Sequence, residues 1–148
     1  MNGLFPAMKK RKRIRSMKYH IGDKGSFSKT VTESDICAFA GISGDFNPVH
    51  VNKINAEKSI FGRQIAHGFL SASFISTAIG MYMPGPGTIY LKQELEFISP
   101  VCIGDTVTAS VEITEIEGKK AVLNTVVMNQ QDTLVIKGTA TVRLPETS

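Results

Sequence analysis

The last third of the chain alternates apolar and polar residues in four segments. They are residues 88–97, 106–117, 121–130 and 133–144. Alternation with a period of two predicts strands with one buried face. Short turns separate the last three segments, at 118–120 and near Gln131 and Asp132, so we expect antiparallel neighbours. A shorter strand is expected at the start of the segment GSFSKTVTESDICAFAG, residues 25–41.

A long apolar helix is predicted at residues 66–83, which contain no Asp, Glu, Lys or Arg. Such a window can indicate a membrane span. However, it includes His67, several hydroxyl side chains and two glycines, and strands follow it. A helix that is apolar all round is more often buried in a soluble protein, so no membrane partner is expected. One such helix on the concave face of an antiparallel sheet predicts an α+β fold.

Two shorter helices are expected before the long one. Thr32 has the character of an N-cap, and Asp35 stands three residues later as a short capping-box variant. The pattern predicts that this first helix ends at Gly41. The segment INAEKSIFG, residues 54–62, predicts a second short helix closed by Gly62.

The net charge of +4 is concentrated in the run KKRKRIR at 9–15, which holds six of the 17 basic residues. The rest of the chain has 11 basic and 13 acidic residues, a net charge of −2. A basic run can bind nucleic acid or anionic lipid. We expect a disordered, solvated tail at 1–16 instead, with no nucleic-acid partner, followed by one domain at 17–148, a length that suits a single core.

The two cysteines, Cys37 and Cys102, stand far apart and form no CxxC motif. This spacing argues against a disulfide framework and against a zinc site, and it suits a cytoplasmic location.

The segment GISGDFNPVHVN, residues 41–52, holds the residues best suited to proton transfer near neutral pH, Asp45 and His50. Pro48 fixes its own φ and keeps Asn47 out of the α region. Asn47 can bond to its own backbone and make the turn rigid. The residues alone leave two interpretations open: a catalytic pair, or an Asx-type loop with a helix cap and an incidental histidine.

The segment AHGF at 66–69 begins the long helix. A helix N-terminus exposes unpaired N–H groups and the positive end of the helix dipole. Gly68 has no side chain to block its amide, which can therefore stabilise a carbonyl oxygen that gains negative charge. The alternative for His67 and Gly68 is helix entry with close packing.

The segments FAGISGDFNPVHVNKINAEKSIFG and IAHGFLSASFIS resemble the MaoC-like (R)-specific enoyl-CoA hydratases. The family signature has an Asp-x-Asn-Pro-apolar-His core, a nearby alanine, and apolar-His-Gly at the start of the central helix. The matching residues here are Asp45, Asn47, Pro48, Val49, His50, Ala56 and residues 65–68. GTIYLKQELEFISPVCIGDTV is similar to a strand and PV-x-x-GD turn of the hot-dog superfamily. The resemblance covers about residues 20–145.

The resemblance implies a hot-dog fold, in which five antiparallel strands wrap a long helix, and a homodimer whose two sheets join. It implies an acid–base dyad of Asp45 and His50, with the amide of Gly68 as oxyanion donor. Asn47 and Ser76 are expected to support the site, although a helical serine more commonly bonds its own i−4 carbonyl. The implied substrate is a trans-2-enoyl-CoA or enoyl-acyl-carrier protein, hydrated to the (3R)-hydroxyacyl product without a metal or cofactor.

Four further residues are candidates for substrate binding. Ile79 and Met81 are candidates for limiting the acyl chain length, although buried helical residues more often belong to the core. Arg63 and Lys92 are candidates for binding the phosphates of CoA, although surface cations more often face solvent only.

Two other functions remain open. A hot-dog thioesterase commonly carries a carboxylate on the central helix, which residues 66–83 lack. A non-catalytic acyl-CoA-binding regulator has no need of the Asp45/His50 pair. The sequence leaves open the chain length, the carrier, the pathway and which dyad member is the base, although Asp45 is favoured as the main acid–base group.

Overall fold

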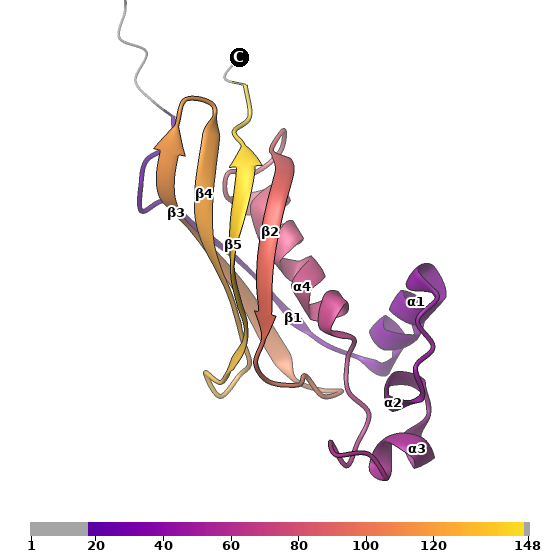
Figure 1. Ribbon diagram of the computed structural model, residues 1–148. Coiled ribbons are helices and arrows are strands. Elements are labelled where there is room, and N and C mark those ends of the chain that lie inside the picture. The colour runs from indigo at the N-terminus through magenta and orange to yellow at the C-terminus, as the bar shows by residue number, and fades with distance from the viewer. Residues whose placement is uncertain (1–17, 147–148) are drawn as a thin grey trace, which may run out of the picture.

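The computed structural model describes residues 18–146, so the tail expected at 1–16 lies outside the described residues. Strands and helices follow one another in an α+β order (Figure 1). They are β1 (Lys24–Thr30), α1 (Glu33–Ser43), α2 (Pro48–Val51), α3 (Lys53–Glu57), α4 (Gly68–Thr77), the π-helical turn η1 (Ala78–Tyr82), β2 (Ile89–Phe97), β3 (Thr106–Glu117), β4 (Lys120–Met128) and β5 (Leu134–Arg143).

The strands form one sheet in the order β1-β3-β4-β5-β2, with every neighbouring pair antiparallel. Figure 1 shows a twisted sheet with α4 along one face and α1, α2 and α3 grouped beyond one end of it. The hairpin between β3 and β4 turns at Gly118 and Lys119, and the turn between β4 and β5 contains Asp132 at a φ of 59°. The expected α+β class and both turns are confirmed.

The core lies between α4 and the inner face of the sheet. Helix α4 packs against β1, β3 and β4, and it contributes the buried side chains of Phe74 and Ile75. Every second residue is buried in β4 and in β3 as far as Ile113: Val107, Ala109, Val111, Ile113, Ala121, Leu123, Thr125 and Val127. Burying each large aliphatic side chain contributes about 1.5–3 kcal/mol, so this face anchors the helix that carries the site.

Helix α1 begins as expected and ends later than expected. The Thr32 hydroxyl accepts the Asp35 N–H at 3.1 Å, and the Asp35 carboxylate accepts the Thr32 N–H at 2.9 Å, which confirms the capping box. The prediction that Gly41 ends the helix is wrong. Gly44 is the C-cap, with a left-handed φ of 79°, and its N–H donates to Ala40; a glycine adopts this conformation without a Cβ penalty.

The central helix is shorter than the expected 66–83. Ala66 donates its N–H to the carbonyl of Val101 at 2.8 Å, so its backbone belongs to an extended segment and the helix begins at Gly68. Regular α-turns end at Thr77, and the π-helical turn η1 follows. Within residues 18–146, no helix has the length and apolarity needed to cross a membrane.

The segment between α1 and α4 also differs from expectation. The short helix expected at 54–62 is α3 (Lys53–Glu57), and Gly62, with a φ of 67°, lies in a later turn. Helix α2 was expected to be a loop. Asn47 is its N-cap and Pro48 its first residue, the two positions that these residue types favour.

Strand β2 is an edge strand with an unusual amount of exposed apolar surface. Ile89, Leu91 and Phe97 were expected to share one buried face, yet they are 53%, 47% and 48% exposed. A register shift between Tyr90 and Lys92 interrupts the pairing with β5. Ile89 therefore lies opposite the exposed Arg143 and Phe97 opposite the buried Ile136, so the exposed apolar residues of β2 are divided between the two faces of the sheet.

Candidate active site

Asp45 is presented by a turn that its own side chain stabilises. Gly44 reverses the chain after α1, and the Asp45 carboxylate accepts the N–H of Asn47 at 3.1 Å. The Ser43 hydroxyl accepts the N–H of Asp45 at 3.2 Å. These bonds fix the backbone around the carboxylate, while the Asp45 side chain remains exposed.

His50 is placed by α2, which begins immediately after this turn. The Asn47 side chain caps the helix by accepting the N–H of Val49 at 3.4 Å. The Nδ1 of His50 lies 2.8 Å from the carbonyl of Ile65. Because a carbonyl only accepts, Nδ1 carries the proton and donates it, and the neutral ring keeps its lone pair on Nε2. The reactive nitrogen of His50 is therefore Nε2.

His67, the N-cap residue of α4, contacts both Asp45 and His50. Its Nε2 donates to the backbone carbonyl of Asp45 at 2.8 Å. Its ring stacks on His50, with centroids 3.9 Å apart and an interplanar angle of 27°, and contacts Phe39 of α1 at 4.9 Å. His67 is 2% exposed. One buried ring therefore ties the start of α4 to both residues of the expected pair.

The structure brings Asp45 and His50 together. An Asp45 carboxylate oxygen and ring nitrogens of His50 and His67 all lie within 4.8 Å of one another. Two groups that share one water through bonds near 2.8 Å are roughly 4.6 Å apart when the angle at the water is tetrahedral. The spacing of the Asp45 carboxylate and the His50 ring therefore suits one shared water molecule.

A cavity of about 270 Å³ reaches from His50 to the N-terminus of α4, and Asp45 stands beside His50 without lining it. His50, Gly68 and Ser71 line it, and most of its wall is apolar. The N–H of Gly68, as the first helical residue, has no partner within the helix. The ring of Phe97 lies against Gly68, where an added Cβ would come within 2.8 Å of a ring carbon. Glycine at 68 therefore lets the Phe97 ring lie directly against the helix end, and a larger residue would displace that ring.

A family model described as "MaoC like domain" matches residues 18–135 of the chain. This range covers well over half of the sequence and includes the whole Asp45–Gly68 arrangement. The chain belongs to the MaoC-like domain family.

Relatives of this MaoC-like domain include characterised sequences and solved structures. An (R)-specific enoyl-CoA hydratase of Rhodospirillum rubrum is 49% identical over 125 residues, which cover 84% of this chain and 87% of the relative. The structure of the (R)-hydratase from A. caviae involved in PHA biosynthesis matches with a TM-score of 0.85 at 40% identity, covering 88% of this chain and 100% of that chain.

The unliganded R-hydratase PhaJ1 from Pseudomonas aeruginosa matches with a TM-score of 0.84 at 40% identity, covering 87% of this chain and 84% of that chain. These structural matches confirm the hot-dog fold.

The structure places the remaining helical candidates away from the cavity. Ser76 is on the exposed face of α4. Ile79 is 1% exposed and belongs to the core, whereas Met81 is 63% exposed. None of the three lines the cavity beside His50. The roles expected for them stay predictions.

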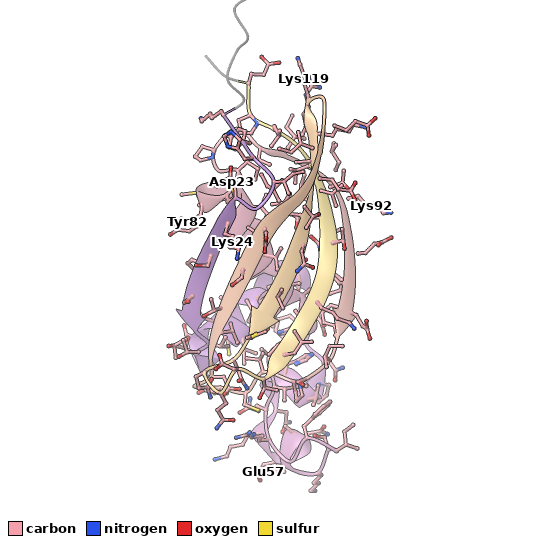
Figure 2. All side chains as sticks on the ribbon, turned by 90° about the vertical axis from the view of Figure 1, so that its left-hand side faces the viewer. Asp23, Lys24, Glu57, Tyr82, Lys92 and Lys119 are labelled. Atoms are coloured by element: carbon pink, nitrogen blue, oxygen red, sulfur yellow. The ribbon has the colours of Figure 1, made fainter. Side chains whose placement is uncertain are left out.

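The two candidate phosphate ligands lie in different places. Arg63 lines a separate hollow with Lys53 and Cys102, close to the α2–α4 segment. Lys92 pairs with Glu94 at 3.0 Å on β2. Glu57 of α3 lines the same hollow as Arg63, and Figure 2 shows Lys92 far from Glu57. Arg63 is therefore closer to the α2–α4 segment that carries the site than Lys92 is.

Asp45, His50 and His67 also have the donor types and the proximity that a metal ion requires. Two of their four ring nitrogens, however, donate to the carbonyls of Ile65 and Asp45. The rings are stacked with their planes 27° apart, so their in-plane lone pairs do not point toward a common centre between the rings. This arrangement suits hydrogen bonding to a water better than convergence on one ion.

Sequence reasoning missed three residues of the site. His67 was matched to the family signature but given no role, although its place one residue before Gly68 puts it at the same helix end as the oxyanion donor. Ser71 follows Gly68 by three residues and so shares its helix face, which was a usable signal. Phe97 reaches the site only through the sheet topology, which its local sequence does not reveal.

Proposed function

We propose that the protein is an (R)-specific enoyl-CoA hydratase that adds water reversibly to trans-2-enoyl thioesters. The observation that carries the proposal is the spacing of Asp45 and His50, at most 4.8 Å between a carboxylate oxygen and a ring nitrogen. The cavity beside them is lined by His50 and Gly68. The 49% identity to a hydratase of that name supports the same reaction.

The reaction needs a base, an acid and a donor to the thioester oxygen. His50 Nε2 accepts a hydrogen bond from the water and orients it, since Nδ1 is occupied by Ile65. The Asp45 carboxylate takes a proton from that water as its oxygen bonds to C3 of the substrate. Negative charge moves to the thioester oxygen, where the Gly68 N–H stabilises it.

The carboxylic acid formed on Asp45 then returns the proton to C2. Oxygen and proton reach the same face of the double bond because one residue handles both, so the addition is syn. Acid–base assistance of this kind contributes about 10²–10⁴-fold, and an oxyanion donor adds roughly 3–4 kcal/mol. The residues of the chain supply all three roles.

Hydration of crotonyl-CoA in D₂O tests the proposal. The expected product is (3R)-hydroxybutyryl-CoA with one deuterium at C2 on the face that received the hydroxyl, seen by NMR. An (S)-alcohol or anti addition would contradict the mechanism. Release of free thiol without hydration would indicate a thioesterase; α4 and η1 contain no carboxylate, and burial raises the pKa of the Cys102 thiol, which disfavours a cysteine nucleophile.

The proposed physiological unit is a homodimer, and the proposed location is the cytoplasm. The apolar edge of β2 supports the first proposal. The free thiols of Cys37 and Cys102 support the second, because reducing compartments preserve unpaired cysteines. Either CoA or an acyl-carrier protein is compatible with the cavity, and Arg63 is the proposed contact for the carrier's phosphate.

A further inference from the structure

Ser71 carries a polar group that the fold does not use. Among residues 18–146, two buried side-chain atoms have no hydrogen-bond partner, His67 Nδ1 and Ser71 Oγ. Ser71 is 2% exposed. Burying a hydroxyl without a partner costs free energy, and a native chain that keeps such a group calls for an explanation.

The usual explanation for a helical serine does not apply here. A serine within a helix commonly donates to a carbonyl three or four residues earlier. Ser73 on the same helix does so, to Leu70. The Ser71 hydroxyl makes no such bond, although the backbone N–H of Ser71 reaches the His67 carbonyl at 3.3 Å.

Ser71 and Gly68 are neighbours on the wall of one cavity. Both residues line it together with His50. Three residues span about 4.5 Å along a helix axis, and positions three apart share a face. An acceptor placed about 2.9 Å from each donor bridges a gap of this size. One substrate oxygen at the helix end therefore has room to receive both hydrogen bonds.

The apolar lining of the cavity indicates which substrate atom accepts a hydrogen bond from the Ser71 hydroxyl. Phe97, Val135 and Ile136 give it an apolar wall, and an alkyl chain offers the hydroxyl nothing to bond. A thioester oxygen at Gly68 is an acceptor that gains charge during hydration. We propose that Ser71 Oγ–H donates a second hydrogen bond to the thioester oxygen, as a catalytic residue beside the Gly68 amide. This inference rests on the proposed hydratase function.

The test compares Ser71→Ala with a matched control, Ser73→Ala. Ser73 is exposed and its hydroxyl is already bonded within the helix. In crotonyl-CoA hydration, Ser71→Ala is expected to lower kcat by about 10²-fold with KM within about twofold of wild type, since an oxyanion donor acts in the transition state. Ser73→Ala is expected to match wild type.

A stability readout separates this role from plain packing. Ser71→Ala removes an unpartnered buried hydroxyl, so its Tm should equal or exceed that of wild type while its kcat falls. Ser71→Cys keeps the shape with a weaker donor and should lose activity while folded, which covers the case of an unfolded alanine variant. A kcat of folded Ser71→Ala or Ser71→Cys within twofold of wild type overturns the proposal. If wild type and Ser73→Ala both fail to hydrate crotonyl-CoA, the hydratase function itself is overturned, and this inference with it.

Discussion

At the scale of single residues, His67 connects the parts of the site. Its bond to the Asp45 carbonyl and its stack on His50 link the turn that carries Asp45 to the helix that carries His50. A misplacement of catalytic groups by about 1 Å can cost roughly 10²-fold in rate. We therefore interpret His67 as a positioning residue that keeps the carboxylate and the imidazole at the spacing of one water.

We expect His67→Phe to keep the packing against Phe39 and to lose the bond to Asp45. The kcat for enoyl-CoA hydration should fall by about 10-fold to 10²-fold, with little change in KM because the cavity wall does not include His67. Steady-state kinetics together with a thermal unfolding curve checks this. A folded variant with the wild-type kcat would show that the contacts of His67 with Asp45 and His50 are not needed for catalysis.

At the scale of elements, the sequence predicted those helix and strand features that depend only on residues close together in the chain. The Thr32–Asp35 capping box and the alternating faces of β3 and β4 could be predicted because each depends on neighbours in the chain. The start of α4 could not, since the Ala66 N–H bonds to Val101, a partner 35 positions away. Asn47 and Pro48 are residue types that favour the N-cap and first position of a helix. They are also common in loops, so α2 was not predicted.

The Asp45/His50 pair could be predicted from the sequence, through the family resemblance, because only four residues of one short segment lie between the two side chains. The cavity could not. Its wall joins α4 to the end of β2 and to β5, and only the sheet order places those strands beside the helix end.

The capping box of α1 makes a pH-dependent contribution to stability. The hydrogen bond to the Thr32 backbone, with help from Lys29 at 3.0 Å, lowers the pKa of Asp35 below 3.8. A carboxylate whose folded pKa is depressed stabilises the fold above its unfolded pKa and loses that contribution as the pH falls through the folded value.

We expect Asp35→Asn to lower the free energy of unfolding by about 0.5–1 kcal/mol at pH 7. The difference from wild type should shrink below about pH 4 and vanish once the wild-type carboxyl is protonated. Urea unfolding at pH 7 and pH 3, at one fixed protein concentration, measures it. An equal difference at both pH values would mean that charge plays no part in the cap.

At the scale of the whole molecule, the two edges of the sheet differ in character. The edge strand β1 reads KGSFSKT, with polar outward residues, whereas β2 exposes Ile89, Leu91 and Phe97. A long apolar edge strand is an aggregation hazard unless it is covered. A second exposed apolar feature is the face of α4, which has no charged side chain and carries Phe69 at 66% exposure. Both features fit burial against a second copy.

The oligomeric state tests this. Light scattering coupled to gel filtration should give twice the 16.1 kDa chain mass for wild type. Leu91→Lys, which places a charge on the β2 edge, should shift the mass toward one chain. Ser26→Lys on the β1 edge is the control and should remain a dimer. A wild-type protein of single-chain mass would contradict the proposal.

The central claim is that the Asp45 carboxylate and the His50 imidazole grip one water beside the amide of Gly68. The most direct measurement is the crotonyl-CoA hydration rate of Asp45→Asn, with Asp23→Asn, near the far end of the sheet (Figure 2), as a control for loss of charge. We expect Asp45→Asn to fold like wild type and to lose activity by about 10²-fold or more, while Asp23→Asn keeps its activity. Near-normal turnover by folded Asp45→Asn would contradict the account.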